Sequence, residues 1–258
     1  MTRSLLGRLL DGGRPPRIVP HRGPVDETSV APGSRSGALR AAIFGVNDGL
    51  VSNLSLIMGV AGASVGRTAI LVAGVAGVVA GAFSMAAGEY LSMRVQRELF
   101  ERLIHQEAHE IATMPEQERR ELVALYRDRG MPADIAEAVT EALMRDPEVA
   151  LDTHAREELG LDPSSLGSPW GAAASSFVMF ALGATAPLLP FLFMSGPGAT
   201  RLAIAVGAVS LFVVGAALSR LTGRGALRSG LRMLLIGGTA AAITYGVGSL
   251  LHVGGVTG

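Results

Sequence analysis

Five segments of the chain are long and apolar enough to cross a lipid bilayer as helices. A hydrocarbon core of about 30 Å requires roughly 20 mostly apolar residues in helical conformation. The segments that meet this requirement are Leu39–Ala63, Thr68–Met93, Trp170–Met194, Leu202–Leu221 and Leu231–Val253. Between the second and the third, a strongly charged pattern replaces the apolar one. We therefore predict an all-α membrane protein with five transmembrane helices and a helical polar domain between spans two and three.

The charged segment keeps a helical period. The helix of the second span has no Gly or Pro after Gly88 and is expected to continue to about Ala112. Thr113 and Glu116 match the ends of an N-terminal capping box, with Pro at the first helical position. Shorter helices are then expected over about 115–129, 132–145 and 147–159, each bounded by Gly or Pro. Prolines 187 and 190 should kink the third span.

The amino-acid composition is typical of a membrane protein and excludes functions that require cysteine or lysine. The chain of 258 residues is 49% hydrophobic and has a mean hydropathy of +0.41, which is typical of several membrane spans. It contains no Cys and no Lys, which excludes disulfides, thiolate sites, Schiff bases and a phosphate-binding lysine loop. Residues 94–168 hold 17 of the 22 acidic and 9 of the 22 basic residues, a local net charge of 9 − 17 = −8.

The arginines predict the orientation of the spans. Seven arginines, from Arg3 to Arg40, precede or open the first span, and four lie around the link between the fourth and fifth. The other two short links hold one each, Arg67 and Arg201. Because arginine-rich loops stay in the cytosol, we expect the N-terminus and the acidic domain to be cytosolic and the C-terminus to lie outside.

These patterns divide the chain into four parts. Residues 1–37 are rich in Arg, Pro and Gly and lack a cleavable signal peptide, so we expect a disordered cytosolic tail there. Spans one and two occupy 38–93, the acidic helical domain 94–168, and spans three to five 169–258.

Two carboxylates lie inside the predicted spans, Asp48 and Glu89. A charge within the bilayer is costly, so such a residue is a candidate for function. Asp48 and its neighbour Asn47 belong to a polar patch that suits the lining of a pathway, although a hydrogen-bonded structural cluster is the alternative. Glu89 is either part of that pathway or an interfacial residue that snorkels or pairs with Arg94. Met85, one turn before Glu89, offers a thioether for a transition metal, but it could also serve packing alone.

Several carboxylates of the acidic domain lie on apolar helix faces. At about 100° per residue, Glu107 and Glu110 share a stripe with two leucines and a methionine, and Glu158 shares one with Leu151 and Leu159. Burying carboxylates together is unfavourable unless a cation neutralises them. We therefore predict a metal site here, with His154 one turn before Glu158. A solvated acidic surface is the alternative, and we expect it for five further glutamates of the domain: Glu116, Glu118, Glu121, Glu137 and Glu141.

A second stripe of the extended helix carries Glu98 and Glu101 together with His105 and His109. These two glutamates are further candidate metal ligands. Because this stripe faces away from the first, we do not expect all three histidines of the domain to share one site.

Three motifs resemble the vacuolar iron transporter family: FGVNDGLVSNLSLIMGVAGA in the first span, GAFSMAAGEYLSM in the second and PLLPF in the third. The segment LDTHAREELGLDP fits the same pattern. The resemblance covers about residues 39–255. It implies a homodimer with five spans per chain, a cytosolic metal-collecting domain, and exchange of protons for Fe²⁺ and in some members Mn²⁺.

Carried over by position, the resemblance assigns Asp48 and Met85 to the intramembrane pathway. It assigns Glu107, Glu110 and Glu158 to metal collection. This chain departs from the family where His154 and Ala155 replace two methionines. Glu98 and Glu101 lie near a further family pair but a step out of register.

We therefore expect a proton-coupled transporter that exports Fe²⁺ from the cytosol, with Mn²⁺, Co²⁺ and Zn²⁺ as further candidate ions. It is expected to be no enzyme and to need no cofactor. Its partners would be metal ions, protons, the lipid membrane and a second copy of the chain, with no nucleic acid. Two alternatives remain open at this point: a metal-sensing membrane protein without transport, and an acidic membrane scaffold for a basic partner.

Overall fold

The structure is a computed structural model and describes residues 34–64, 66–164, 166–223 and 225–253. The tail expected over residues 1–37 lies outside the described residues as far as residue 33. Throughout the described part the regular secondary structure is helical, without strands. Five of the helices are long and apolar enough to cross a membrane, as the hydropathy pattern predicts. The chain is therefore an all-α, multi-pass membrane protein.

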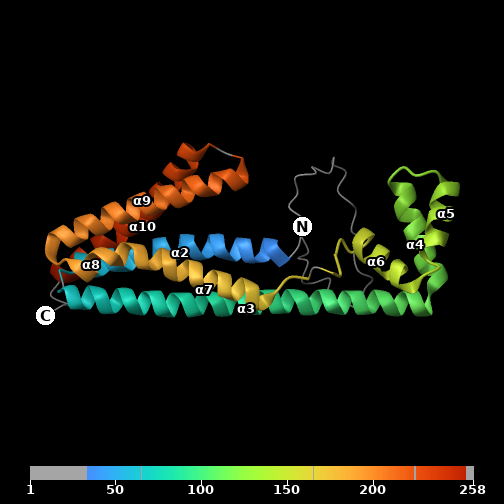
Figure 1. Cartoon of the computed structure of the whole chain (residues 1–258), viewed down its shortest axis with the longest axis horizontal. Coiled ribbons are helices and arrows are strands. Elements are labelled where there is room, and N and C mark those ends of the chain that lie inside the picture. Colours follow the sequence, from blue (N-terminus) through green and yellow to red (C-terminus); the bar gives the residue numbers. More distant parts are fainter. Residues whose placement is uncertain (1–33, 65, 165, 224, 254–258) are drawn as a thin grey trace, which may run out of the picture. The chain divides into compact units, whose positions relative to one another are not determined.

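The first two spans lie in α2 (Ser34–Gly62) and α3 (Arg67–Thr113), and the last two in α9 (Gly196–Thr222) and α10 (Ala226–Val253). The third span is α7 (Pro169–Thr185), followed by the short 3₁₀ helix η1 (Ala186–Leu188) and α8 (Leu189–Phe193) (Figure 1). Pro187 and Pro190 lie in these two short elements, so the prolines break the third span as expected.

Helix α2 is the centre of the membrane part. It packs most extensively against α7 and next against α10, and it also contacts α3 and α9. The α2–α7 approach depends on glycine: a Cβ on Gly49 would collide with the carbonyl oxygen of Phe180, and one on Gly183 with that of Val46. Leu50, Leu54 and Ile57 of α2 anchor the largest buried apolar cluster.

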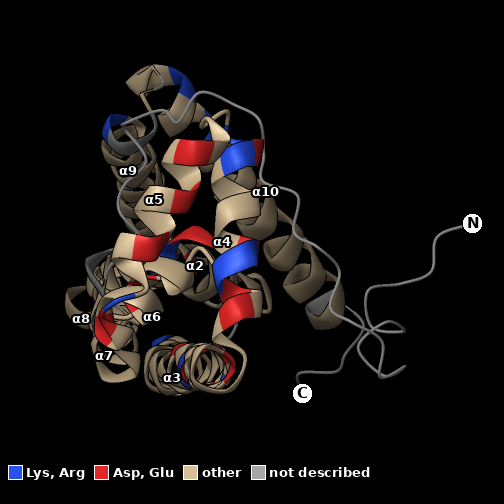
Figure 2. Ribbon diagram, turned by 90° about the vertical axis from the view of Figure 1, so that its right-hand side faces the viewer, with Lys and Arg blue, Asp and Glu red and all other residues tan. Residues whose placement is uncertain are grey.

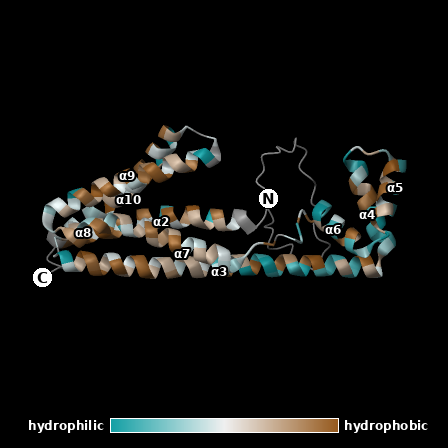
Figure 3. Ribbon diagram, viewed as in Figure 1, coloured by the Kyte–Doolittle hydropathy of each residue, from teal (hydrophilic) through white to brown (hydrophobic). Residues whose placement is uncertain are grey.

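Helix α3 is a single unbroken helix of 47 residues (Figure 1). At 1.5 Å per residue it is about 70 Å long, more than twice the hydrocarbon core. Its first part is hydrophobic and its last part largely hydrophilic (Figure 3). One continuous helix therefore joins the second span to the acidic segment.

Three short helices follow in the acidic segment: α4 (Pro115–Asp128), α5 (Ala133–Leu143) and α6 (Pro147–Glu157). Charged residues run along α4 and α5 (Figure 2). Asp146 caps α6 by accepting a hydrogen bond from the backbone N–H of Glu148, 2.9 Å away. The capping box predicted at Thr113 is wrong. Helix α4 begins after Met114 without a side-chain cap, because the Thr113 hydroxyl donates to the carbonyl of His109.

Candidate metal centre and transmembrane cavity

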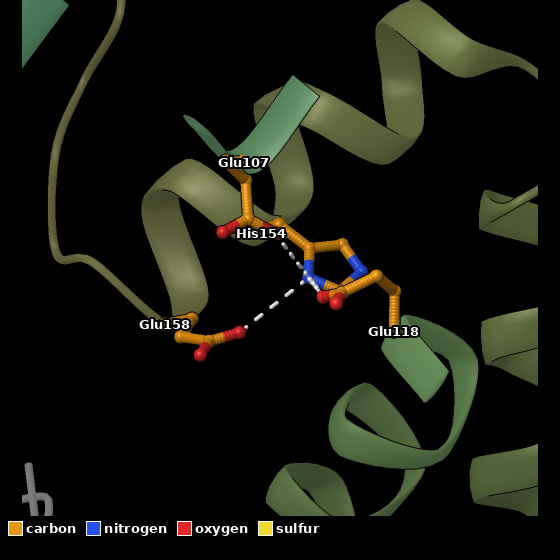
Figure 4. A group of neighbouring side chains, drawn as sticks. All are labelled: Glu107, Glu118, His154 and Glu158. Atoms are coloured by element: carbon orange, nitrogen blue, oxygen red, sulfur yellow. Dashed lines mark ion pairs between the residues drawn. The ribbon is translucent and has the colours of Figure 1, made fainter. Parts of the chain in front are cut away.

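Four side chains of the acidic domain converge on one point (Figure 4). Glu107 comes from α3, Glu118 from α4, His154 from α6, and Glu158 from the residue that ends α6. Each offers one oxygen or nitrogen atom, and these atoms all lie within 4.8 Å of one another. We call these four residues the acidic-domain cluster. Three helices that are separate in sequence thus build one group of potential ligands.

The imidazole of His154 lies at the centre of the acidic-domain cluster. Its Nδ1 atom is 3.0 Å from Glu107 Oε1, 3.5 Å from Glu158 Oε2 and 3.8 Å from Glu118 Oε2. The side chain of His154 is fully buried, while those of Glu107 and Glu118 are 5% and 4% exposed. Glu158, with 37% of its side chain exposed, leaves one side of the cluster open to solvent.

Local sequence explains why these groups are buried. Ala150 and Ala155 on α6 are fully buried, and their small side chains let α6 approach its neighbours. His154 and Glu158 are four residues apart and therefore lie on one side of the α6 terminus. Glu118 lies one turn before Leu122, which is 1% exposed, so the buried face of α4 carries both a carboxylate and a leucine.

Burial and mutual repulsion shift the proton affinities of the acidic-domain cluster. Burial raises the pKa of the Glu118 carboxyl to about 7, and the negative charge of Glu107 adds to that shift. Burial alone would lower the pKa of His154. The adjacent carboxylates of Glu107 and Glu158 more than offset that effect and raise this pKa to about 9. At neutral pH an imidazolium ion therefore neutralises part of the carboxylate charge.

The acidic-domain cluster has unused ligand capacity. Among the described residues, Glu107 Oε1 and both ring nitrogens of His154 are buried without a hydrogen bond of good geometry. Such groups are costly to bury unless something else satisfies them. Three carboxylates and one imidazole form a mixed oxygen and nitrogen donor set of the kind that divalent transition metals accept. A cation at this point would replace the imidazolium proton as the neutralising charge.

The other candidate ligands of the acidic domain lie outside this cluster. Glu110 accepts a hydrogen bond from Gln106 at 3.1 Å, although it is close enough to add to the raised pKa of Glu118. Glu98 and Glu101 form ion pairs with Arg94 and Arg97, four residues earlier on the surface of α3. The structure thus brings Glu107, Glu158 and His154 together and leaves Glu98, Glu101 and Glu110 apart from them.

Glu118 is the ligand candidate that sequence reasoning missed. We expected it on a solvated surface, but it is 3% exposed and belongs to the acidic-domain cluster. The available signal was its spacing from Leu122, because a glutamate one turn before a buried leucine shares its face. The same argument does not extend to Glu116, whose side chain is 75% exposed beside Arg119.

A second site lies between the first two spans. A cavity of about 350 Å³ is lined by α2, α3 and Phe180 of α7, and its oxygen- and sulfur-bearing side chains belong to Asp48, Ser52, Asn53, Ser84 and Met85. The remaining lining is mostly small, with Gly77 and Gly81 on α3. The structure therefore brings the predicted pair Asp48 and Met85 to one cavity.

Asn47 and Glu89 are not among the described residues that line this cavity, although Asn47 precedes Asp48 and Glu89 follows Met85 by four residues. The side-chain oxygen of Asn47 is buried and has no hydrogen-bond partner in the described part of the chain. Glu89 lies one turn from Met85 and is 3.6 Å from Arg40, which belongs to α2. The partner of Glu89 is thus Arg40 rather than the Arg94 considered from sequence.

A family model described as the VIT family matches residues 39–249 of this chain. The chain belongs to the VIT family. The vacuolar iron transporter 1 of Oryza sativa subsp. japonica is 32% identical over 210 residues, which is 81% of this chain and 83% of the relative. The vacuolar iron transporter of Acanthamoeba castellanii is 34% identical over 221 residues, 83% of this chain and 79% of the relative.

A third relative of this VIT family chain is the vacuolar iron transporter homolog 1 of Oryza sativa subsp. japonica. It is 37% identical over 237 residues, which is 91% of this chain and 83% of the relative. The resemblance seen in the span motifs is therefore confirmed. VIT family proteins are transporters rather than enzymes, and no cofactor is indicated for the family.

Proposed function

We propose that this VIT family chain exports divalent transition-metal ions from the cytosol, Fe²⁺ foremost, in exchange for protons. The observation that carries the proposal is the acidic-domain cluster: four ligand atoms from three helices within 4.8 Å of one another. Family membership supports metal transport, because the relatives are named as vacuolar iron transporters. The donor set of carboxylates and imidazole is also compatible with Mn²⁺, Co²⁺ and Zn²⁺.

In this mechanism the two sites act in sequence. Glu107, Glu118, His154 and Glu158 collect an ion from the cytosol. The ion then enters the membrane cavity, where Asp48 supplies a charge and Met85 a thioether. Glu89 and Asn47, which are near Met85 and Asp48 along their helices, belong to the same route.

Proton exchange follows from competition at these groups. A carboxylate cannot hold a proton and a metal ion at the same lone pair, so an ion that binds Asp48 displaces a proton and one that leaves allows a proton to return. The same competition applies to His154 in the acidic-domain cluster, because a metal ion can bind its Nδ1 atom only after the imidazolium proton is lost. Inward movement of protons would then drive outward movement of metal.

We also propose that two copies of the chain form the transporter. Asp48 and Ser52 are exposed on α2, on the same helix face as Phe44 and Leu56, which are 52% and 40% exposed. A carboxylate cannot face hydrocarbon at low cost. A second copy packed against this face would cover Asp48 and enclose the cavity. The arginine distribution supports a cytosolic N-terminus and acidic domain, with the C-terminus outside.

The two alternative functions are less well supported. A scaffold for a basic partner would use exposed glutamates such as Glu116, and it does not explain why Glu107 and Glu118 are buried together at no more than 5% exposure. A sensor without transport would explain the acidic-domain cluster, but it leaves the polar cavity between α2 and α3 without a purpose.

Reconstitution into proteoliposomes tests the proposal. Purified protein is inserted into vesicles, and the uptake of Fe²⁺, Mn²⁺, Co²⁺ and Zn²⁺ is followed together with internal pH. We expect metal uptake that increases with an outward proton gradient and is accompanied by proton efflux. Metal binding without flux would favour the sensor, and absence of metal binding would favour the scaffold. Metal flux that is indifferent to the proton gradient would remove the exchange mechanism.

A further inference from the structure

Asn53 of α2 is one of the most deeply buried polar residues in the membrane part, at 2% exposed. Its amide nitrogen donates a hydrogen bond to the carbonyl oxygen of Ala184, 2.6 Å away at the end of α7. Its amide oxygen, Oδ1, is buried and has no hydrogen-bond partner in the described part of the chain. Because the nitrogen is held by Ala184, the side chain cannot turn over without placing two oxygens against each other. The unpaired atom is therefore the oxygen.

The Oδ1 atom of Asn53 points toward α3. A Cβ atom built on Gly77 would lie 2.5 Å from it, which places the oxygen against the one residue type that leaves room for it. Both Asn53 and Gly77 line the cavity that also contains Asp48 and Met85. An unpaired oxygen buried at the wall of a polar cavity is expected to serve a ligand.

We propose that the amide oxygen of Asn53 is a third, neutral ligand for the ion in the membrane cavity, and that Gly77 preserves the space it needs. This inference rests on the proposed transport function. It adds a specificity-determining residue to the route through Asp48 and Met85. One carboxylate, one amide oxygen and one thioether carry a single negative charge in total, so the site binds a divalent ion without neutralising it fully. Incomplete neutralisation favours release of the ion as well as entry.

A pair of substitutions separates this role from a structural one. Asn53→Leu and Asn53→Met both remove the hydrogen bond to Ala184, and both introduce a larger side chain, of nearly the same volume in the two variants. Only methionine replaces the lost oxygen with a potential ligand, a thioether that prefers softer ions. In proteoliposomes we expect Asn53→Leu to raise the KM for Mn²⁺ about tenfold, the order expected for loss of one contact to a charged group. Asn53→Met should retain flux but increase the ratio of Cd²⁺ to Mn²⁺ transport. Equal behaviour of the two variants would overturn the proposal.

A second test leaves Asn53 in place. Gly77→Ala brings a methyl group against Oδ1, and also against the side chain of Leu56, while the hydrogen bond to Ala184 can remain. We expect a higher KM for the ion with an unchanged amount of folded protein. Gly88→Ala is the matched control on the same helix, because a Cβ there meets nothing within 4 Å. If Gly77→Ala transports like Gly88→Ala, the oxygen is not a ligand. This result decides the matter even if both Asn53 variants fail to fold.

Asp48→Asn in the same assay distinguishes failure of the inference from failure of the proposed function. If Asp48→Asn loses flux while the Asn53 and Gly77 variants behave like the wild type, only the role of Asn53 is refuted. If the wild-type protein itself shows no metal flux, the transport function fails, and with it the inference.

Discussion

The acidic-domain cluster and the membrane cavity, the two sites that we propose for the ion, are built in opposite ways. In the cluster, three carboxylates surround a fully buried imidazole, and the ligand atoms already lie close together. In the cavity, a single carboxylate shares about 350 Å³ with uncharged groups, and Asp48 is exposed in the single chain. The first site is rich in charge and compact. The second is poor in charge and open.

This difference indicates that the acidic-domain cluster is suited to tight binding of an ion and the membrane cavity to its passage. Several carboxylates at one point bind a divalent cation tightly, but they also bind protons, as the raised pKa values of Glu118 and His154 show. A site with one carboxylate binds more weakly and releases more easily, which suits a step in transit. The predictions below test this contrast, beginning with the largest effect.

Replacing Asp48 by asparagine should have the largest effect. Among the described residues that line the cavity, Asp48 is the only carboxylate, so an ion bound there loses the compensating charge that this chain supplies. Removing one partner of a buried charge pair costs about 3–5 kcal/mol, which predicts a loss of metal flux of at least roughly hundredfold. The measurement is initial uptake in proteoliposomes, with dimer content checked by size-exclusion chromatography. Wild-type flux in the folded variant would remove Asp48 from the mechanism.

Replacing Glu118 by glutamine should have a smaller effect, because three ligands of the acidic-domain cluster remain. We expect the affinity of the full-length protein for Mn²⁺ to fall on the order of tenfold to hundredfold, as for loss of one charged contact. Titration calorimetry in detergent measures this. Glu116→Gln is the matched control, since that side chain is exposed on the same helix. Equal affinity of the two variants would mean that burial of Glu118 has no connection with metal.

The pH profile of metal binding should depend on His154. A bound metal must displace the protons of Glu118, with a pKa of about 7, and of His154, with a pKa of about 9. Affinity should therefore continue to rise above pH 7, by up to about tenfold per pH unit for each proton displaced. His154→Met should remove the part of this rise that comes from the imidazolium proton, and it should weaken Zn²⁺ and Co²⁺ more than Mn²⁺. If both proteins show the same profile and the same metal ranking, the site consists of carboxylates alone.

The smallest effect is expected at Glu98 and Glu101. Both form exposed pairs with arginines on the same helix, and such pairs contribute about 0.3–0.5 kcal/mol. Glu98→Gln and Glu101→Gln, alone or together, should leave the number of bound metal ions and their affinity unchanged within error in calorimetry. If the double variant bound fewer metal ions than the wild type, this part of α3 would hold a further metal site. The acidic-domain cluster would then not be the only compact site of the domain.

The positions of the helices, and which of them span the membrane, could be predicted from the sequence because both depend on local sequence patterns. Apolar length predicts the spans, and the Asp146–Pro147 pair predicts the start of α6. The stripe that contains Glu107 correctly indicates a carboxylate packed against another element, for Glu107 is 4% exposed. The same stripe misleads at Leu99, which is 50% exposed, because α6 covers only part of α3.

The composition of the site was harder to predict, because it depends on how α4 and α6 lie against α3. Glu118 could not be separated from its charged neighbours by periodicity alone. The ordinary pKa of histidine, near 6.5, also misleads for His154, since the carboxylates of Glu107 on α3 and of Glu158 at the end of α6 raise this pKa. Pairing of Glu89 with Arg40 likewise requires the antiparallel register of α2 and α3.

Because α3 is one unbroken helix, it fixes both the distance between Met85 and Glu107 along its axis and the angle between them around it. A helix advances about 1.5 Å and turns about 100° with each residue. Insertion of one residue between these positions would therefore swing every later side chain by more than a quarter turn, while hardly changing the length. Insertion of seven would restore the phase to within about 20° and move the acidic domain about 10 Å farther from the membrane. Insertions close to a whole number of turns should therefore preserve the direction of the acidic domain while they change its distance from the bilayer.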